Sequence, residues 1–86
     1  NKTYKIYPLD ILYVEGMREY VKIYTQLETI VTKSSLTKFH EQLPNNLFIR
    51  VHKSFIINII KVRAFTTTTV EIHNKKIPIG RSYKIN

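Results

Sequence analysis

The chain contains no cysteine, and this absence removes several classes of function. Cysteine-based zinc fingers and thiol catalysis both need a thiolate, so neither is available to this protein. Small secreted domains often depend on disulfides, so the composition favours a reducing, cytoplasmic setting. No hydrophobic run approaches the roughly 20 residues that a membrane-spanning helix needs. We therefore expect a protein without a membrane partner.

Glycine is also scarce, and two isolated glycines cannot build a Gly-rich phosphate-binding loop. The three histidines, His40, His52 and His73, are widely spaced, and none has a second histidine or a carboxylate at metal-ligand spacing. Glu15 and Glu19 flank one loop, but a carboxylate pair without a pocket is weak support for acid–base catalysis. We therefore expect no enzymatic activity, no metal and no cofactor.

Acidic residues are few: 6 Asp and Glu stand against 14 Lys and Arg, which gives a formal net charge of +8. Such an excess indicates an anionic partner, with nucleic acid favoured over an anionic membrane surface. The simpler alternative is a charge that only maintains solubility. The chain has 86 residues, 43% of them hydrophobic, which suits one domain over residues 1–86. Because the first residue is Asn1 rather than Met, we expect a fragment of a longer protein.

Short segments rich in Ile, Val, Tyr and Thr predict a mainly β, antiparallel fold. The expected strands cover residues 11–15, 20–25, 29–32, 48–51, 59–65, 69–73 and 76–79. A hairpin loop is expected at residues 15–19, with Gly16 free to take a positive φ. Further tight connections are expected at residues 26–28 and 74–75, and the threonines of residues 66–69 are interpreted as a strand edge.

One segment has helical spacing. Leu36, Phe39 and Leu43 fall at i, i+3 and i+7, which places them on one face of a helix. Ser34 or Ser35 can cap the N-terminus, and Pro44 follows the end. The sequence therefore predicts a short amphipathic helix over residues 35–43.

The segment of residues 48–58, FIRVHKSFIIN, contains the most specific pattern. Ile49, Val51, Phe55 and Ile57 form an apolar alternate row, and Lys53 interrupts that row in its middle. A charge on the core face of a strand is costly, so the chain is expected to turn at residues 52–54 and carry all three side chains into solvent. A short basic turn between two apolar anchors is suited to an anionic polymer.

Basic residues gather at the expected connections, whereas single lysines such as Lys33 are interpreted as solvated surface charges. The residues at connections are Arg18, His52, Lys53 and Arg81. Arg suits bidentate contact with guanine or phosphate, and Lys suits phosphate as a point charge. Arg81 follows a rigid apolar step, and Gly80 before it permits close approach to another surface.

For three other polar residues, the sequence either leaves two roles equally supported or favours a structural role. For Tyr20, stacking on a ligand and ordinary packing are equally supported. For Arg50, a phosphate contact and an internal salt bridge are equally supported. For Asn58, stabilisation of the local backbone is favoured over a contact with a base.

The sequence resembles the LytTR family of bacterial DNA-binding domains. The matching blocks are DILYVEGMREYVKIYT, SLTKFHEQLP, FIRVHKSFIINIIKV and IPIGRSYK, which together span about residues 10–84. The resemblance implies an elongated arrangement of small antiparallel sheets with one short helix. It also implies that loops enter successive major grooves of bent DNA, and that the domain follows a phosphorylated receiver domain in a response regulator. Its contact positions fall on the loop before Tyr20, on residues 52–53 and on Arg81.

We therefore expect sequence-specific binding of double-stranded DNA by the output domain of a bacterial two-component transcriptional regulator. Paired short repeats and a dimer on DNA are the expected arrangement, with a receiver domain upstream. The alternatives are RNA binding through a β surface and a protein-interaction module with a basic surface. The candidate DNA-binding residues are Arg18, Tyr20, Arg50, His52, Lys53 and Arg81.

Overall fold

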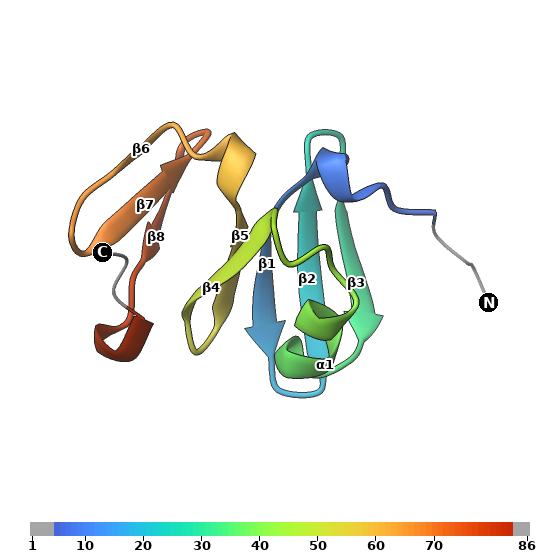
Figure 1. The fold of residues 1–86 in the computed structure, drawn as a ribbon. Helices are drawn as coiled ribbons and strands as arrows, with labels where there is room; N and C mark the ends of the chain where they lie inside the picture. The colour runs from blue at the N-terminus through green and yellow to red at the C-terminus, as the bar shows by residue number, and fades with distance from the viewer. Residues whose placement is uncertain (1–4, 84–86) are drawn as a thin grey trace.

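A computed structural model describes residues 5–83 and arranges them in two antiparallel sheets and one short helix (Figure 1). The strands of the larger sheet lie in the order β3-β2-β1-β5-β4, and those of the smaller sheet in the order β6-β7-β8. The expected mainly β class is confirmed. In chain order the elements are η1 (Pro8–Asp10), β1 (Ile11–Met17), β2 (Tyr20–Thr25), β3 (Thr29–Lys33), α1 (Leu36–Glu41), β4 (Phe48–His52), β5 (Phe55–Asn58), η2 (Ile59–Lys61), β6 (Ala64–Phe65), β7 (Thr69–Ile72), β8 (Lys75–Pro78) and η3 (Arg81–Tyr83).

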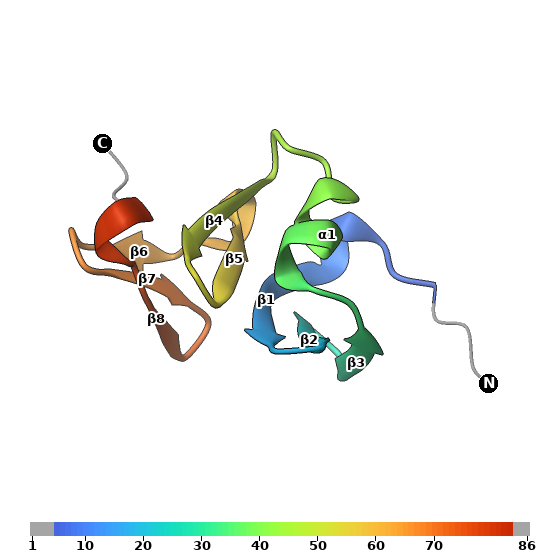
Figure 2. The same cartoon turned by 90° about the horizontal axis from the view of Figure 1, so that it is seen from below.

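The molecule is elongated, with extents of 41 × 24 × 22 Å, because the two sheets lie side by side along the long axis. Helix α1 covers one face of the five-stranded sheet, as the view from below shows (Figure 2). One apolar cluster lies under the helix, and a second joins the five-stranded sheet to the three-stranded sheet. The central strands are therefore buried on both faces, which alternation of residue types alone does not predict.

Strand β5 shows the consequence of this double burial. Asn58, which falls on the polar alternate row between the apolar residues of this segment, is fully buried at the end of β5. Its side-chain amide donates a hydrogen bond to the Ile11 carbonyl oxygen at 2.8 Å, and its Oδ1 accepts one from the Ile60 amide at 3.1 Å. The structural role expected for Asn58 is confirmed, but the continuous strand expected over residues 59–65 is wrong. Asn58 caps the 3₁₀ turn η2, and only Ala64–Phe65 is strand.

The β1–β2 hairpin differs from the expectation in one respect. Gly16 lies within β1, and the positive φ, 57°, belongs to Arg18 in the two-residue turn. Gly16 is needed for space instead, because a Cβ atom there would lie 3.1 Å from Cβ of Leu36 in α1. This glycine lets the helix pack closely on the sheet.

The helix and the turns of the smaller sheet also refine the expectations. Ser35 caps α1 by accepting a hydrogen bond from the Lys38 amide at 3.1 Å, and the helix ends two residues before the predicted Leu43. In the smaller sheet, Thr66 forms the β6–β7 turn rather than a strand edge, because its Oγ1 accepts the amides of residues 68 and 69. The β7–β8 turn lies one residue early, with His73 at φ 53°.

Candidate nucleic-acid interface

Three basic connections lie at one end of the strands. Antiparallel pairing of Met17 with Tyr20 and of Glu15 with Phe55 places the β1–β2 turn and the β4–β5 turn at the same edge of the sheet. The 3₁₀ turn η3 reaches this edge from the smaller sheet (Figure 1). The edge, here called the basic edge, therefore carries Arg18, Lys53 and Arg81, all exposed.

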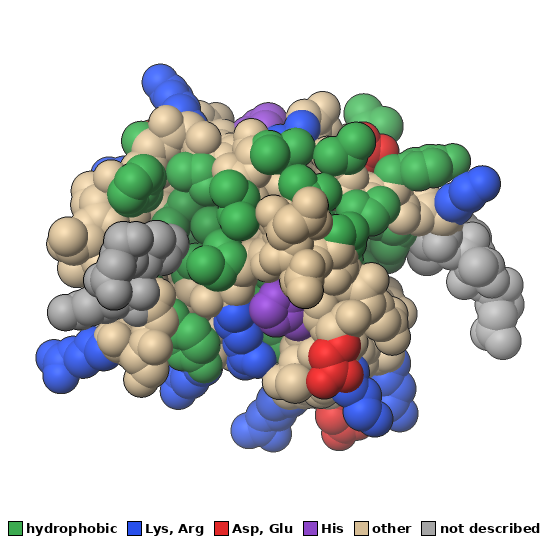
Figure 3. Space-filling view, in the orientation of Figure 1, with side chains coloured by type: hydrophobic (Ala, Val, Ile, Leu, Met, Phe, Trp, Pro, Cys, Tyr) green, Lys and Arg blue, Asp and Glu red, His purple; other side chains and the backbone are tan. Residues whose placement is uncertain are grey.

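The distribution of charge follows this geometry. Lys and Arg side chains gather along the lower edge of the molecule in Figure 3. Acidic side chains lie beside them at the lower right, on the side of the molecule where α1 lies. A depression next to the β1–β2 turn is lined by Arg18, Glu19, Lys33 and Lys38 among others. Lys38 was not a candidate from the sequence, because its place beside Arg18 depends on how α1 packs over β1 and β2. Its position in the first turn of an amphipathic helix was the available signal.

The turn between β4 and β5 is tighter than expected. Lys53 and Ser54 form it, and of the three residues expected in solvent only Lys53 is exposed. His52 is half-buried, with its ring centroid 5.6 Å from that of Phe55. The Nδ1 atom of His52 accepts a hydrogen bond from the Ser54 amide at 3.0 Å. In the neutral imidazole the proton then lies on Nε2, which is left as a donor.

The smaller sheet brings Arg81 to this turn. The Gly80 amide donates a hydrogen bond to the Val51 carbonyl oxygen in β4 at 2.7 Å. A Cβ atom at Gly80 would lie 3.5 Å from Cδ2 of His52 and 3.0 Å from Cδ2 of Tyr83. The close approach of Gly80 in this structure is to β4 of the same chain, and it sets Arg81 beside the residues of the β4–β5 turn.

Tyr20 lies outside the core, whereas the Arg50 side chain is hydrogen-bonded within the fold. Tyr20 begins β2 with 48% of its surface exposed and belongs to neither core cluster. Tyr20 therefore lies outside the core, and its stacking on a ligand stays a prediction. The Arg50 guanidinium, by contrast, bonds inward to the His52 and Lys53 carbonyl oxygens and to Thr37 Oγ1. These are internal hydrogen bonds to neutral groups rather than the internal salt bridge considered from the sequence.

Other types of site find little support in the part of the chain that the structure covers. Residues 5–83 contain no group of three or more His, Asp or Glu side chains arranged to hold a metal ion. Across the same residues, every buried side-chain nitrogen or oxygen atom has a hydrogen-bond partner. None of the helices described above has the length and apolar character needed to cross a membrane.

Comparison with known proteins places this architecture in a family. The family model of the LytTr DNA-binding domain matches residues 1–86, the whole chain. This chain belongs to the LytTR family. The LytTR domain is similar to a solved structure, the LytTr DNA-binding domain of a Bacillus cereus protein described as a methyl-accepting/DNA response regulator. The two agree with a TM-score of 0.81 and 27% identity over 91% of this chain and 77% of that one.

Curated relatives of the LytTR domain are longer proteins. The sensory transduction protein LytT of Bacillus cereus is 35% identical over 86% of this chain and 32% of its own length. LytT of Enterococcus faecalis is 27% identical over 96% of this chain and 37% of its own length. The transcriptional regulatory protein YpdB of Escherichia coli K12 is 37% identical over 63% of this chain and 22% of its own length. The chain thus spans about a third or less of these relatives.

Proposed function

We propose that this LytTR domain binds double-stranded DNA sequence-specifically, as the output domain of a bacterial two-component transcriptional regulator. The observation that carries the proposal is the basic edge. Three connections, each with an exposed Lys or Arg, lie at one end of the strands and are supplied by both sheets. Loops held on a rigid β scaffold can present separate contacts to one ligand surface.

The dimensions of the domain support contact with successive major grooves. The long axis measures 41 Å, and one turn of B-DNA is about 34–36 Å. The basic edge runs along this axis in Figure 1, with η3 toward one end of the molecule and the β1–β2 turn nearer its middle. We propose that Arg18 and Arg81 contact neighbouring grooves on one face of bent DNA.

Each candidate residue has a role suited to its position. Arg81 contacts a guanine edge or a phosphate with its planar fork, and Lys53 contacts phosphate as a point charge. His52 offers its Nε2–H to the same region of the DNA. Arg18 and Tyr20 contact the neighbouring groove. Arg50, the sixth candidate, belongs to this surface through the turn that it bonds.

The relatives suggest the cellular setting. Their names describe sensory transduction and transcriptional regulation, and they extend well beyond the matched region. We infer that residues 1–86 form a single LytTR domain downstream of a receiver domain in a cytoplasmic regulator. Since one small domain offers limited contact area, two domains on paired short repeats are the expected arrangement on DNA.

Selection from a random pool of duplex DNA at physiological salt tests the proposal. Enrichment of a short motif, in two copies about one helical turn apart, is the expected result. If about five phosphates are neutralised, log K should fall with log salt at a slope near −4 to −5. Salt-sensitive retention without any enriched motif would contradict sequence-specific binding.

RNA binding through the sheet surface has less support. Base stacking on a sheet needs exposed aromatic side chains in the middle of neighbouring strands. The exposed aromatic residues in the described part of the chain are Tyr7, Tyr20 and Phe65, and these lie on separate segments. Competition between duplex DNA and single-stranded RNA separates the two functions. Preference for RNA would favour RNA binding over DNA binding as the function.

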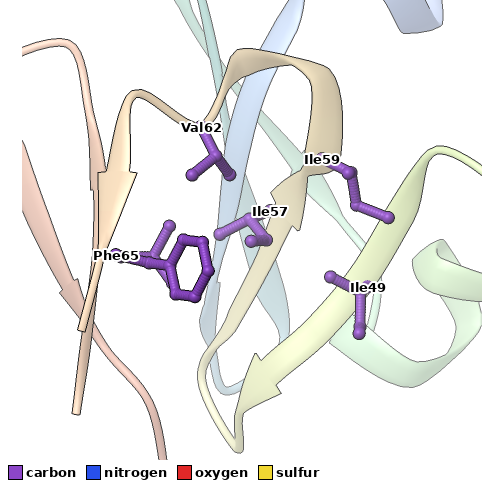
Figure 4. A pocket seen from close by; sticks show the side chains of 6 residues that line it. Ile49, Ile57, Ile59, Val62 and Phe65 are labelled. Atoms are coloured by element: carbon purple, nitrogen blue, oxygen red, sulfur yellow. The ribbon is translucent and has the colours of Figure 1, made fainter. Parts of the chain in front are cut away.

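A protein-interaction function has one observation in its favour. An apolar pocket of about 370 Å³ opens between the two sheets, beside the exposed Phe65 (Figure 4). Such a pocket is typical of sites that take an apolar side chain or ligand. This second function predicts weak nucleic-acid binding without sequence preference. The pocket is lined by Ile49, Ile57, Ile59, Val62, Phe65 and Val70.

A further inference from the structure

Strand β4 contains an irregularity just before the β4–β5 turn. Pairing between the strands shifts register between Arg50 and His52, which face Ile56 and Phe55, so Val51 is an extra residue on β4. A bulge of this kind bends the strand and interrupts the ladder of backbone hydrogen bonds. The carbonyl groups around the bulge and the turn accept hydrogen bonds from several parts of the fold.

Arg50 supplies partners for two of these carbonyl groups. Its Nε–H donates to the His52 carbonyl oxygen at 3.2 Å, and an Nη2–H donates to the Lys53 carbonyl oxygen. An Nη1–H donates to Oγ1 of Thr37 in α1 at 2.9 Å. Three donors of one planar group thus join His52 at the end of β4, and Lys53 in the turn, to the helix.

The carbonyl groups on either side of these two, those of Val51 and Ser54, are bonded to backbone amides from elsewhere in the fold. The Ser54 carbonyl oxygen accepts the Gly16 amide of β1 at 2.8 Å, and the Val51 carbonyl oxygen accepts the Gly80 amide at 2.7 Å. The consecutive carbonyl groups of residues 51–54 are therefore bonded to β1, to the segment before η3, and to the Arg50 side chain. Arg50 is the member of this set whose contribution depends on its side chain.

We propose that Arg50 is a positioning residue for DNA recognition, which fixes His52 and Lys53 relative to α1 without contacting DNA itself. The proposal rests on the function proposed above. Recognition needs contact groups held within about 0.5 Å, and a loose turn loses the preferred sequence before it loses general attraction to phosphate. Lysine cannot replace this group, because an ammonium lacks the planar fork that reaches two carbonyls and a hydroxyl together.

The variants Arg50→Lys and Arg50→Gln separate positioning from phosphate contact. For positioning, both should lose about tenfold in affinity for the preferred duplex, with the salt slope unchanged. For phosphate contact, Arg50→Gln should lower the salt slope by about one and Arg50→Lys should restore it. Lys53→Gln is the matched control, because loss of a phosphate-contacting charge should lower the slope by about one. Thermal unfolding of each variant confirms that it is folded at the temperature of the titration.

Amide hydrogen exchange in the free 86-residue chain tests the same idea without DNA. Arg50→Lys should speed exchange at Gly16 and Ser54 about tenfold, while exchange at Glu28 in the opposite turn stays constant. Unchanged exchange at both sites, or full specific affinity in Arg50→Lys, would overturn the proposal. If the wild-type domain selects no DNA motif, the proposed function fails, and the exchange result still decides whether Arg50 fixes the turn.

Discussion

Two turns at opposite ends of the five-stranded sheet are held in different ways. The turn at residues 53–54 is bonded to Gly16 and, through Arg50, to the helix, and Val51 shortly before the turn is bonded to Gly80. The turn at residues 26–28 is closed by Thr25, whose Oγ1 accepts the Leu27 and Glu28 amides and donates to the Glu28 carbonyl oxygen. The first turn is fixed by the fold around it, and the second by its own residues.

This difference in hydrogen bonding indicates which of the two turns has a fixed position that is important for function. A turn closed by local bonds can shift as a unit, and Leu27 at its tip is 95% exposed. A turn bonded to several other elements keeps its side chains at fixed distances from theirs. Recognition of a rigid ligand such as duplex DNA needs the second arrangement. This difference supports the proposal that DNA contacts the basic edge rather than the opposite end of the sheet.

The largest effect should come from removing two contacts at the basic edge. We expect Arg81→Ala to cost about 1–3 kcal/mol in DNA binding, roughly 5- to 150-fold, and to relax specificity at one position. Adding Lys53→Ala should increase the loss, because both residues are proposed to contact the same DNA. Titration of labelled duplex at fixed salt measures both effects.

Leu27→Ser is the control at the opposite end of the sheet. It should leave DNA affinity within about 0.5 kcal/mol of the wild type, since an exposed side chain in a locally closed turn contributes little. Equal losses in Leu27→Ser and Arg81→Ala would break the comparison between the two ends. An Arg81→Ala variant with full affinity and unchanged sequence preference would remove Arg81 from the interface.

The next largest effect should fall on stability. Asn58→Leu leaves the Ile11 carbonyl group and the Ile60 amide without their buried partner, which should lower the free energy of unfolding by about 1–3 kcal/mol. Because Asn58 ends β5 away from the basic edge, the folded variant should keep its DNA sequence preference. Urea unfolding and DNA titration measure the two quantities. Altered preference in a folded variant would show that the two ends are coupled.

Local sequence patterns were sufficient for part of this fold. Lys53 in the middle of an apolar row predicted the β4–β5 turn, because a charge cannot lie on a core face without cost. Ser35, with apolar residues at helical spacing after it, predicted α1. These features depend on residues that are near one another in the chain. The grouping of the basic connections at one edge follows from antiparallel pairing, which the family resemblance implied.

Features that depend on distant segments could not be predicted. Asn58 was placed on a polar face, because the alternation of β5 contains no sign that sheets and helix cover both of its sides. The bond from Arg50 to Thr37 joins residues 13 apart in sequence, and it exists because α1 returns over the sheet. The same packing explains Gly16. The absence of a side chain there makes room for Leu36, and it does not serve to permit a positive φ.

A smaller effect is expected from Gly16→Ala, which tests how the basic edge is joined to the helix. The new methyl group would lie 3.1 Å from Cβ of Leu36, a buried residue, so α1 must move outward. Overpacking of this kind costs about 1–2 kcal/mol of stability, partly offset by lower entropy of the unfolded chain. Thermal unfolding measures the change. Increased stability would mean that the helix moves freely, and that its bond to Arg50 does not fix the turn.

The smallest effect should come from Tyr24→Phe, in β2 next to the turn at residues 26–28. The Tyr24 hydroxyl donates to the Glu15 carboxylate at 3.0 Å, and its ring stacks on Tyr13 with centroids 4.3 Å apart. Burial, with the hydrogen bond to Glu15 and its negative charge, raises the pKa of Tyr24 to about 12. Loss of this bond should lower the free energy of unfolding by about 1 kcal/mol at neutral pH.

The pH dependence of this variant identifies the cause. A tyrosine has a pKa of about 10 in the unfolded chain, so the folded state holds the phenolic proton more tightly. The stability from Tyr24 is therefore fully present below pH 10 and is lost as pH rises toward 12. Urea unfolding between pH 8 and 12 should show the wild-type advantage shrinking in that window, while DNA affinity at pH 7 stays equal in both proteins. A constant difference across the window would mean that Tyr24 acts through packing, and a loss of DNA affinity would extend the interface from the turns into the sheet.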